Sequence, residues 1–213
     1  MTMKKLFLSL FGLLCSTSLV AHPHSFLDMQ NKVLINQDKL EGFELTWWLD
    51  EITSAELIYE IKSAVNQAEA IQKITREMDI SAVENHYFSE LYNAENQPIK
   101  FKAKPQKSSM EIKDNRIVYR FTLALSEPPM VKGQSFRFYT FEPSYYLSMA
   151  YESAKDVTAS EQHLCKVSME EPKVNQDLRL YASQLDKEDM PDLPSESLSL
   201  GAQFAQKVSI VCK

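Results

Sequence analysis

Residues 27–49 read LDMQNKVLINQDKLEGFELTWWL and contain two runs in which apolar and polar side chains alternate. Apolar residues occupy every second position in 27–35, with Asn31 as the exception, and again in 43–49. A period of two indicates strands that bury one face. The polar residues 36–39 between the two runs are typical of a short turn. The stretch therefore predicts a β-hairpin.

The spacing of apolar residues changes directly after the hairpin. Over 57–68 they follow steps of three and four, which is typical of an amphipathic helix. We expect helical structure to continue to about Leu91, with a break near Asp79–Ser81. Asp50, or one of the hydroxyl residues after it, is expected to cap the start of this helical segment.

Strand patterns return after Pro98. Alternation predicts strands at 99–103, 117–125, 136–141, 145–151, 164–169 and 208–212, and a short helix at 177–185 followed by a loop at 189–199. This order predicts an α+β fold, with a mainly antiparallel β-sheet whose N-terminal hairpin is followed by a helical segment. The chain contains no internal repeat or linker, so we expect one domain.

Residues 1–21 have the layout of a secretory signal peptide. Lys4 and Lys5 precede an apolar run at 6–14, and small residues lead to Ala21. The apolar run is too short to span a membrane as a helix. We therefore expect residues 1–21 to be cleaved and 22–213 to form a single periplasmic domain that does not span the membrane.

The charge and glycine content exclude several classes of function. The net charge of −6 argues against a nucleic-acid partner, and removal of Lys4 and Lys5 with the leader makes it −8. With only four glycines, the chain lacks Gly-rich phosphate-binding loops. No nucleophile-elbow serine and no HExxH motif occur either. We therefore do not expect an enzyme.

Two cysteines remain once the leader is removed. An even pair in an exported chain predicts a disulfide, here between Cys165 and Cys212. The alternative is a pair of thiolate metal ligands, although the chain has no CxxC spacing.

Two histidines follow the predicted cleavage site, in the order His22, Pro23, His24. Two imidazoles one residue apart can chelate zinc, copper or nickel. Pro23 has no N–H to lose, which disfavours a square-planar site built on backbone nitrogens. Alternatively, the histidines merely flank the cleavage site. A copper redox site is a further alternative, and it requires cleavage immediately before His22.

Carboxylates and one further histidine are additional candidate ligands. Asp50 and Glu51 lie where the second strand gives way to the helix, and either can supply an oxygen to a zinc site. The alternative is that they only complement the helix dipole. His86, which precedes Glu90 by four residues, is an optional third ligand if both lie on one helix face.

Several motifs together resemble the DUF1007 family. They are His22-Pro23-His24, Trp47-Trp48-Leu49-Asp50-Glu51, Tyr87-Phe88 and Phe141-Glu142-Pro143-Ser144-Tyr145-Tyr146. The resemblance spans His22 to about Cys165, and a cysteine near the end also fits. It implies a periplasmic protein associated with zinc or nickel/cobalt-type metal transport. It supports His22, His24, Asp50 and Glu51 but not His86, and Glu142 stands where the family more often has aspartate.

These observations lead to one functional expectation and one alternative. We expect a periplasmic accessory protein that captures a divalent cation and delivers it to an inner-membrane permease. Zinc (Zn2+) is the first candidate, and nickel (Ni2+) or cobalt (Co2+) are alternatives. Alternatively, the protein is an assembly or interaction module for a nickel/cobalt-type permease and binds no metal itself.

Overall fold

The computed structural model describes residues 23–186 and 189–213, and the predicted signal peptide at 1–21 lies outside them. The strands are β1 (Ser25–Asn36), β2 (Lys39–Leu49), β3 (Ser89–Asn93), β4 (Gln106–Lys113), β5 (Arg116–Ala124), β6 (Ser135–Thr140), β7 (Leu147–Ala150), β8 (Val157–Ala159), β9 (Cys165–Glu170) and β10 (Lys207–Cys212). The helices are α1 (Glu51–Ser63), α2 (Gln67–Glu84), α3 (Gln176–Gln184) and α4 (Leu200–Phe204), and the 3-10 turns are η1 (His86–Phe88) and η2 (Ala154–Asp156). The predicted α+β class is confirmed.

The first sheet is built around the predicted hairpin. Its order is β4-β5-β2-β1-β7, and β8 also pairs with β1. The hairpin is confirmed, because β1 and β2 are antiparallel with Met29 opposite Trp47 and Val33 opposite Phe43. Pairing of β2 with β5 and of β5 with β4 is antiparallel too, whereas β7 and β8 run parallel to β1.

The two faces of this sheet differ in polarity, as the alternation predicts. Val33, Phe43 and Trp47 lie on the buried face. On the opposite face, Asp28 forms an ion pair of 2.6 Å with Arg116. Antiparallel sheets commonly have one packed and one solvated face, and this arrangement accounts for the period of two in the sequence.

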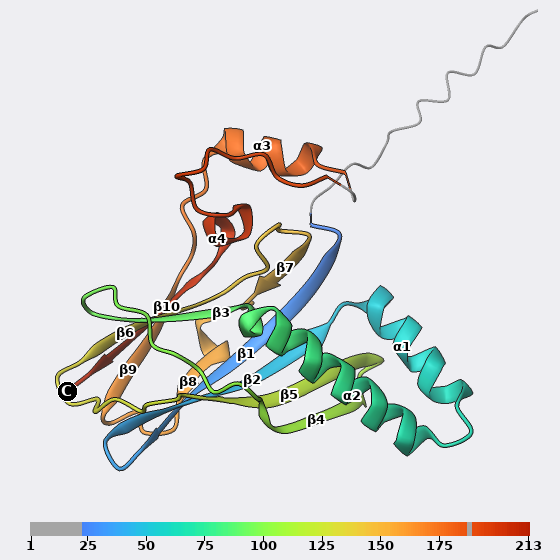
Figure 1. The fold of residues 1–213 in the computed structure, drawn as a ribbon, viewed down its shortest axis with the longest axis horizontal. Helices are drawn as coiled ribbons and strands as arrows, with labels where there is room; N and C mark the ends of the chain where they lie inside the picture. Colours follow the sequence, from blue (N-terminus) through green and yellow to red (C-terminus); the bar gives the residue numbers. More distant parts are fainter. Residues whose placement is uncertain (1–22, 187–188) are drawn as a thin grey trace, which may run out of the picture.

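The second sheet and the first two helices share the buried face of the first sheet. The second sheet has the order β3-β6-β10-β9 and is antiparallel throughout. Its Phe138 stacks on Phe43 with ring centroids 4.3 Å apart. Farther along, α1 contacts β5 and α2 contacts β4, and the two helices lie side by side in Figure 1. One main core therefore forms between these layers.

The predicted helical segment is wrong in where it breaks and where it ends. The break lies at residues 64–66, where Ala64 is extended and the Asn66 side chain accepts a hydrogen bond from the backbone of Glu69. No break occurs at 79–81, since α2 runs through these residues to Glu84. The helix does not reach Leu91, which lies in β3.

The strand predicted at 99–103 is also wrong, because this segment crosses from one sheet to the other. Ile99 N donates to the carbonyl of Leu91 in the second sheet. Three residues later, Lys102 N donates to the carbonyl of Ala124 in the first sheet. The segment forms only isolated bridges, and Pro98 at its start has no N–H to extend a ladder.

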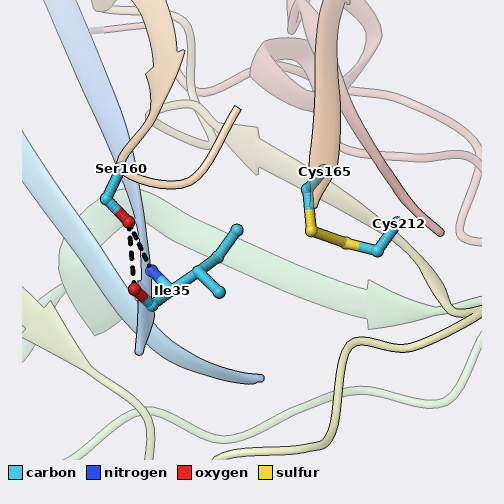
Figure 2. The surroundings of a disulfide bond; sticks show 4 residues. All are labelled: Ile35, Ser160, Cys165 and Cys212. Carbon is cyan, nitrogen blue, oxygen red and sulfur yellow. Dashed lines mark hydrogen bonds between the residues drawn. A yellow bond between two sulfur atoms is a disulfide. The ribbon is translucent and has the colours of Figure 1, made fainter. Parts of the chain in front are cut away.

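The predicted disulfide between Cys165 and Cys212 is confirmed. The two residues face each other across β9 and β10, and both are buried. Figure 2 shows the bond beside a second connection, in which the Ser160 hydroxyl accepts from Ile35 N (2.9 Å) and donates to its carbonyl (3.1 Å). The disulfide thus fastens the end of β10 to the start of β9 in the second sheet, and Ser160 fastens the end of β8 to β1 in the first sheet.

Within residues 23–186 and 189–213, no helix combines the length and the apolar character needed to cross a membrane.

Candidate functional site

The start of β1 is hydrogen-bonded to Tyr146, the residue that precedes β7. The backbone N–H groups of His24 and Ser25 both donate to the carbonyl of Tyr146, at 2.9 and 3.2 Å. The imidazole of His24 also lies against the Tyr146 ring, with centroids 5.3 Å apart and planes inclined by 34°. His24 is nevertheless exposed. The contacts with Tyr146 therefore hold His24 at the start of β1, where the residue remains exposed.

Asp50 joins this strand start to the first turn of α1. Its Oδ1 accepts from Thr53 N (2.8 Å), as an N-cap side chain does. Its Oδ2 accepts from the hydroxyls of Ser25 (2.8 Å) and Thr53 (2.9 Å) and from Phe26 N (3.2 Å). The carboxylate is therefore the N-cap of α1 and at the same time a clamp on the residue that follows His24.

These hydrogen bonds stabilise the ionised form of the Asp50 carboxyl group. Burial alone would raise the pKa of its carboxyl group, but donation from Thr53, Ser25 and Phe26 favours the ionised form and leaves the pKa lowered. The ionised carboxylate of Asp50 therefore binds Ser25, the residue directly after His24. Glu51, the next residue, is exposed in the first turn of α1.

Glu142 braces the turn that carries the Tyr146 carbonyl. Its carboxylate accepts from Ser144 N (2.9 Å), the Ser144 hydroxyl (2.6 Å) and Tyr146 N (2.9 Å). A longer contact of 3.4 Å comes from Leu147 N. This bracing role of Glu142 is not among the sequence predictions. An acidic residue two positions before a serine, with proline between them, is the signal that indicates such a turn.

Residues of α4 pack against the same turn. Tyr145, in the left-handed region at φ 64°, stacks on Phe204 with centroids 4.1 Å apart. Gly201 N donates to the carbonyl of Pro143 (3.0 Å), and a Cβ at Gly201 would overlap the carbonyl of Glu142. Only glycine permits this close approach between α4 and the turn.

His86 does not share a helix face with Glu90, so the basis for that prediction is wrong. It lies in η1, with φ at 51°, and Glu90 lies in β3. Among the described residues, no three His, Cys, Asp or Glu side chains are grouped so as to hold a metal ion. The other predicted histidine ligand, His22, lies outside the described residues.

The arrangement at the start of β1 thus has three chemical features. It has an exposed imidazole at His24, a hydrogen-bonded carboxylate at Asp50 and an exposed carboxylate at Glu51. Nitrogen and oxygen donors of this kind suit zinc and related divalent cations. His22, two residues before His24, is the predicted further donor.

Comparisons with known proteins agree with one another over most of the chain. A family model described as "Protein of unknown function (DUF1007)" matches residues 7–212. A protein of Haemophilus influenzae, named "Uncharacterized protein", is 36% identical over 206 residues, which cover 96% of this chain and 97% of that protein. No solved structure matches the chain.

Proposed function

The chain belongs to the DUF1007 family, and we propose that it is a periplasmic accessory protein that captures a divalent cation and delivers it to an inner-membrane permease. Zinc is the first candidate, with nickel or cobalt as alternatives. The metal is cargo in this proposal, so the site must both bind the ion and release it.

One observation carries the proposal: sequence motifs far apart in the chain meet at the start of β1. The Ser25 hydroxyl donates to Asp50 at 2.8 Å, and His24 N donates to Tyr146 at 2.9 Å. Folding therefore attaches His24 to Tyr146 and the next residue, Ser25, to the carboxylate of Asp50.

The proposed ligands are two histidines and one carboxylate. His22 and His24 provide imidazole nitrogens in this assignment. Glu51 is the preferred oxygen donor, because its carboxylate is exposed in the first turn of α1. Asp50 accepts three hydrogen bonds at Oδ2 but only one at Oδ1, so Oδ1 retains capacity for a metal ion. His86 is not required for this set.

The position of the site suits transfer rather than storage. A closed site with four protein ligands holds zinc as a structural element, whereas fewer ligands leave positions for exchange. His24 is exposed at the start of the described chain, where a second protein can reach it. The acidic chain, at −8 without residues 1–21, would also raise the local concentration of cations.

A zinc titration of the protein without its leader tests the proposal. Competition with a chelating indicator would give the affinity for wild type, His22→Ala, His24→Ala and Glu51→Gln. Each histidine variant is expected to lose about tenfold or more in affinity. His163→Ala is the matched control, since His163 is exposed and pairs with Glu161 instead, at 3.3 Å. Unchanged affinity in both His22→Ala and His24→Ala would overturn the assignment.

A second candidate function rests on the outer face of α1. Ile52, directly after Asp50 and Glu51, is 78% exposed. Tyr59, two turns later on this face, is 75% exposed. Exposed apolar side chains of this kind occur at protein interfaces. In this alternative the protein assembles with the permease and binds no metal itself. Co-purification with the permease in excess chelator, abolished by Ile52→Ser with Tyr59→Ser and retained by Leu180→Ser, would favour it.

A further inference from the structure

A cavity of about 590 Å³ lies where α2 gives way to β3, away from any residue assigned above to metal. Its walls come from the end of α2, from η1, from β3 and from the crossing segment 98–103. The junction of α2 and β3 can be followed in Figure 1. Cavities of this size are typical of sites for small organic ligands.

The interior of the cavity is largely apolar. Leu91 and Tyr87 are buried residues of the main core that also line it. Ile99 and Phe101 of the crossing segment are half-buried and also line it, and Val83 of α2 is 37% exposed in the lining. An aliphatic chain placed among these side chains would be removed from water, which is favourable in proportion to the area buried.

A strained turn forms one wall of the cavity. His86, Tyr87 and Phe88 follow one another in the left-handed region, with φ at 51°, 59° and 51°. Side chains other than glycine adopt this conformation at a cost, and such strain is often found at functional sites. The turn is held by the Tyr87 hydroxyl, which donates to the carbonyl of Lys102 at 2.8 Å. It thereby fixes the Tyr87 side chain against the crossing segment, where its ring also lies 6.2 Å from that of Phe101.

The charged residues of the lining favour an anion. Lys100 and Lys102 are both exposed, and no ion pair of either occurs in the described parts of the chain. Glu90 is the one acidic residue of the lining, and its carboxylate accepts from the Tyr92 hydroxyl at 2.8 Å. Basic side chains beside an apolar cavity are unexpected in a protein of net charge −6. They complement a ligand with an acidic head.

We propose that this cavity binds a free medium-chain carboxylate of the fatty-acid class. The alkyl chain would lie among Leu91, Ile99 and Phe101, and the carboxylate would face Lys100 and Lys102. This proposal is independent of the metal function, because it uses none of His22, His24, Asp50 or Glu51.

Isothermal titration with decanoate, below its micellar concentration, tests the proposal directly. We expect saturable binding to a single site for decanoate. Decanol lacks the charge, decyltrimethylammonium reverses it and acetate lacks the chain, so each is expected to bind more weakly or not at all. Equal binding of decanol and decanoate would overturn the proposal, as would the absence of decanoate binding. Binding to phosphatidylglycerol vesicles without binding of free decanoate would contradict it too.

Matched variants separate the two parts of the proposed site. Lys100→Gln combined with Lys102→Gln is expected to weaken decanoate binding about tenfold, as loss of two partly exposed charge contacts would. Lys104→Gln combined with Lys107→Gln removes two charges that follow the crossing segment and lie outside the lining, and it should leave binding unchanged.

The apolar part is tested on α2, where two exposed apolar residues differ in position. Val83 lines the cavity, whereas Ile80, 57% exposed on the same helix, does not. Val83→Glu should abolish decanoate binding, and Ile80→Glu should preserve it. Equal effects of the two α2 variants, or of the two lysine pairs, would show that decanoate binds elsewhere and would overturn the proposal.

Discussion

The Ser25 hydroxyl donates a hydrogen bond of 2.8 Å to Oδ2 of Asp50, across 25 positions of sequence. This contact joins the first strand to the N-cap of the first helix, one residue after His24. Asp50 thus has a structural task that does not depend on metal. The task accounts for an acidic residue at this point of the chain.

Replacement of Asp50 tests the structural task separately from metal binding. Asp50→Ala removes the N-cap of α1 and the clamp on Ser25, so the free energy of unfolding should fall by about 1–2 kcal/mol. Urea denaturation in excess chelator would measure this loss. Glu51→Ala is the neighbouring control and should change the free energy of unfolding by less than about 0.5 kcal/mol, since Glu51 is exposed. Equal effects of the two variants would contradict the assigned role.

The lowered pKa of Asp50 predicts how this contribution depends on pH. A carboxyl group whose pKa is lower in the folded protein stabilises it above the unfolded pKa, about 3.9 for aspartate. The contribution is lost as the pH falls through the folded pKa. The difference in unfolding free energy between wild type and Asp50→Asn should therefore stay constant from pH 7 to 5 and shrink below about pH 4. A difference that grows on acidification would contradict the direction of the shift.

Gly201 is expected to be intolerant of any side chain. In Gly201→Ala the new Cβ would overlap the carbonyl of Glu142, and backbone atoms must shift to admit it. Overpacking of this kind costs about 1–3 kcal/mol in the free energy of unfolding. The shift would also disturb the turn that carries the Tyr146 carbonyl, so zinc affinity should fall as well. Ser197→Ala, on the exposed loop before α4, is the control and should change neither quantity.

The disulfide should be a major source of stability. Its cysteines are 47 positions apart, and cross-links of this kind typically contribute about 2–4 kcal/mol by restricting the unfolded chain. Cys165→Ser combined with Cys212→Ser should lower the denaturation midpoint. A reductant should lower the midpoint of wild type and leave that of the double variant unchanged. If the reductant had no effect on wild type, the disulfide would not carry this stability.

The strands with one buried face could be predicted from sequence because their environment imposes a period of two. Residues 27–35 and 43–49 show this most clearly, since every second side chain enters the core. The strand at 106–113 could not be predicted in this way. It is an edge strand in which Met110 is the only buried residue, so its sequence carries almost no alternation.

The errors in the helical segment have a local cause. Asn66 caps α2 through Glu69, three residues later, which is a recognised start signal that the apolar spacing obscured. The end of α2 at Glu84 has a different cause. It depends on the left-handed turn at His86–Phe88, and of these three residues only histidine is of a type that favours a positive φ.

The candidate site was predictable in part. His24, Asp50 and Glu51 were accessible to sequence reasoning because their chemistry and their position after a leader or a strand are local features. The turn around Glu142 has a local signal in the sequence, but its contact with His24 has none, because that contact joins residues more than 100 positions apart. Backbone hydrogen bonds from His24 and Ser25 to Tyr146 make this connection.

Metal analysis of the protein isolated from its native compartment is the most direct test of whether His22 and His24 hold a divalent cation. Wild type and the double variant His22→Ala with His24→Ala would be purified in parallel without added metal or chelator. Zinc, nickel and cobalt would then be quantified against protein. The account predicts stoichiometric zinc in wild type and its loss in the double variant. Equal metal content in the two proteins, or none in wild type, would contradict it.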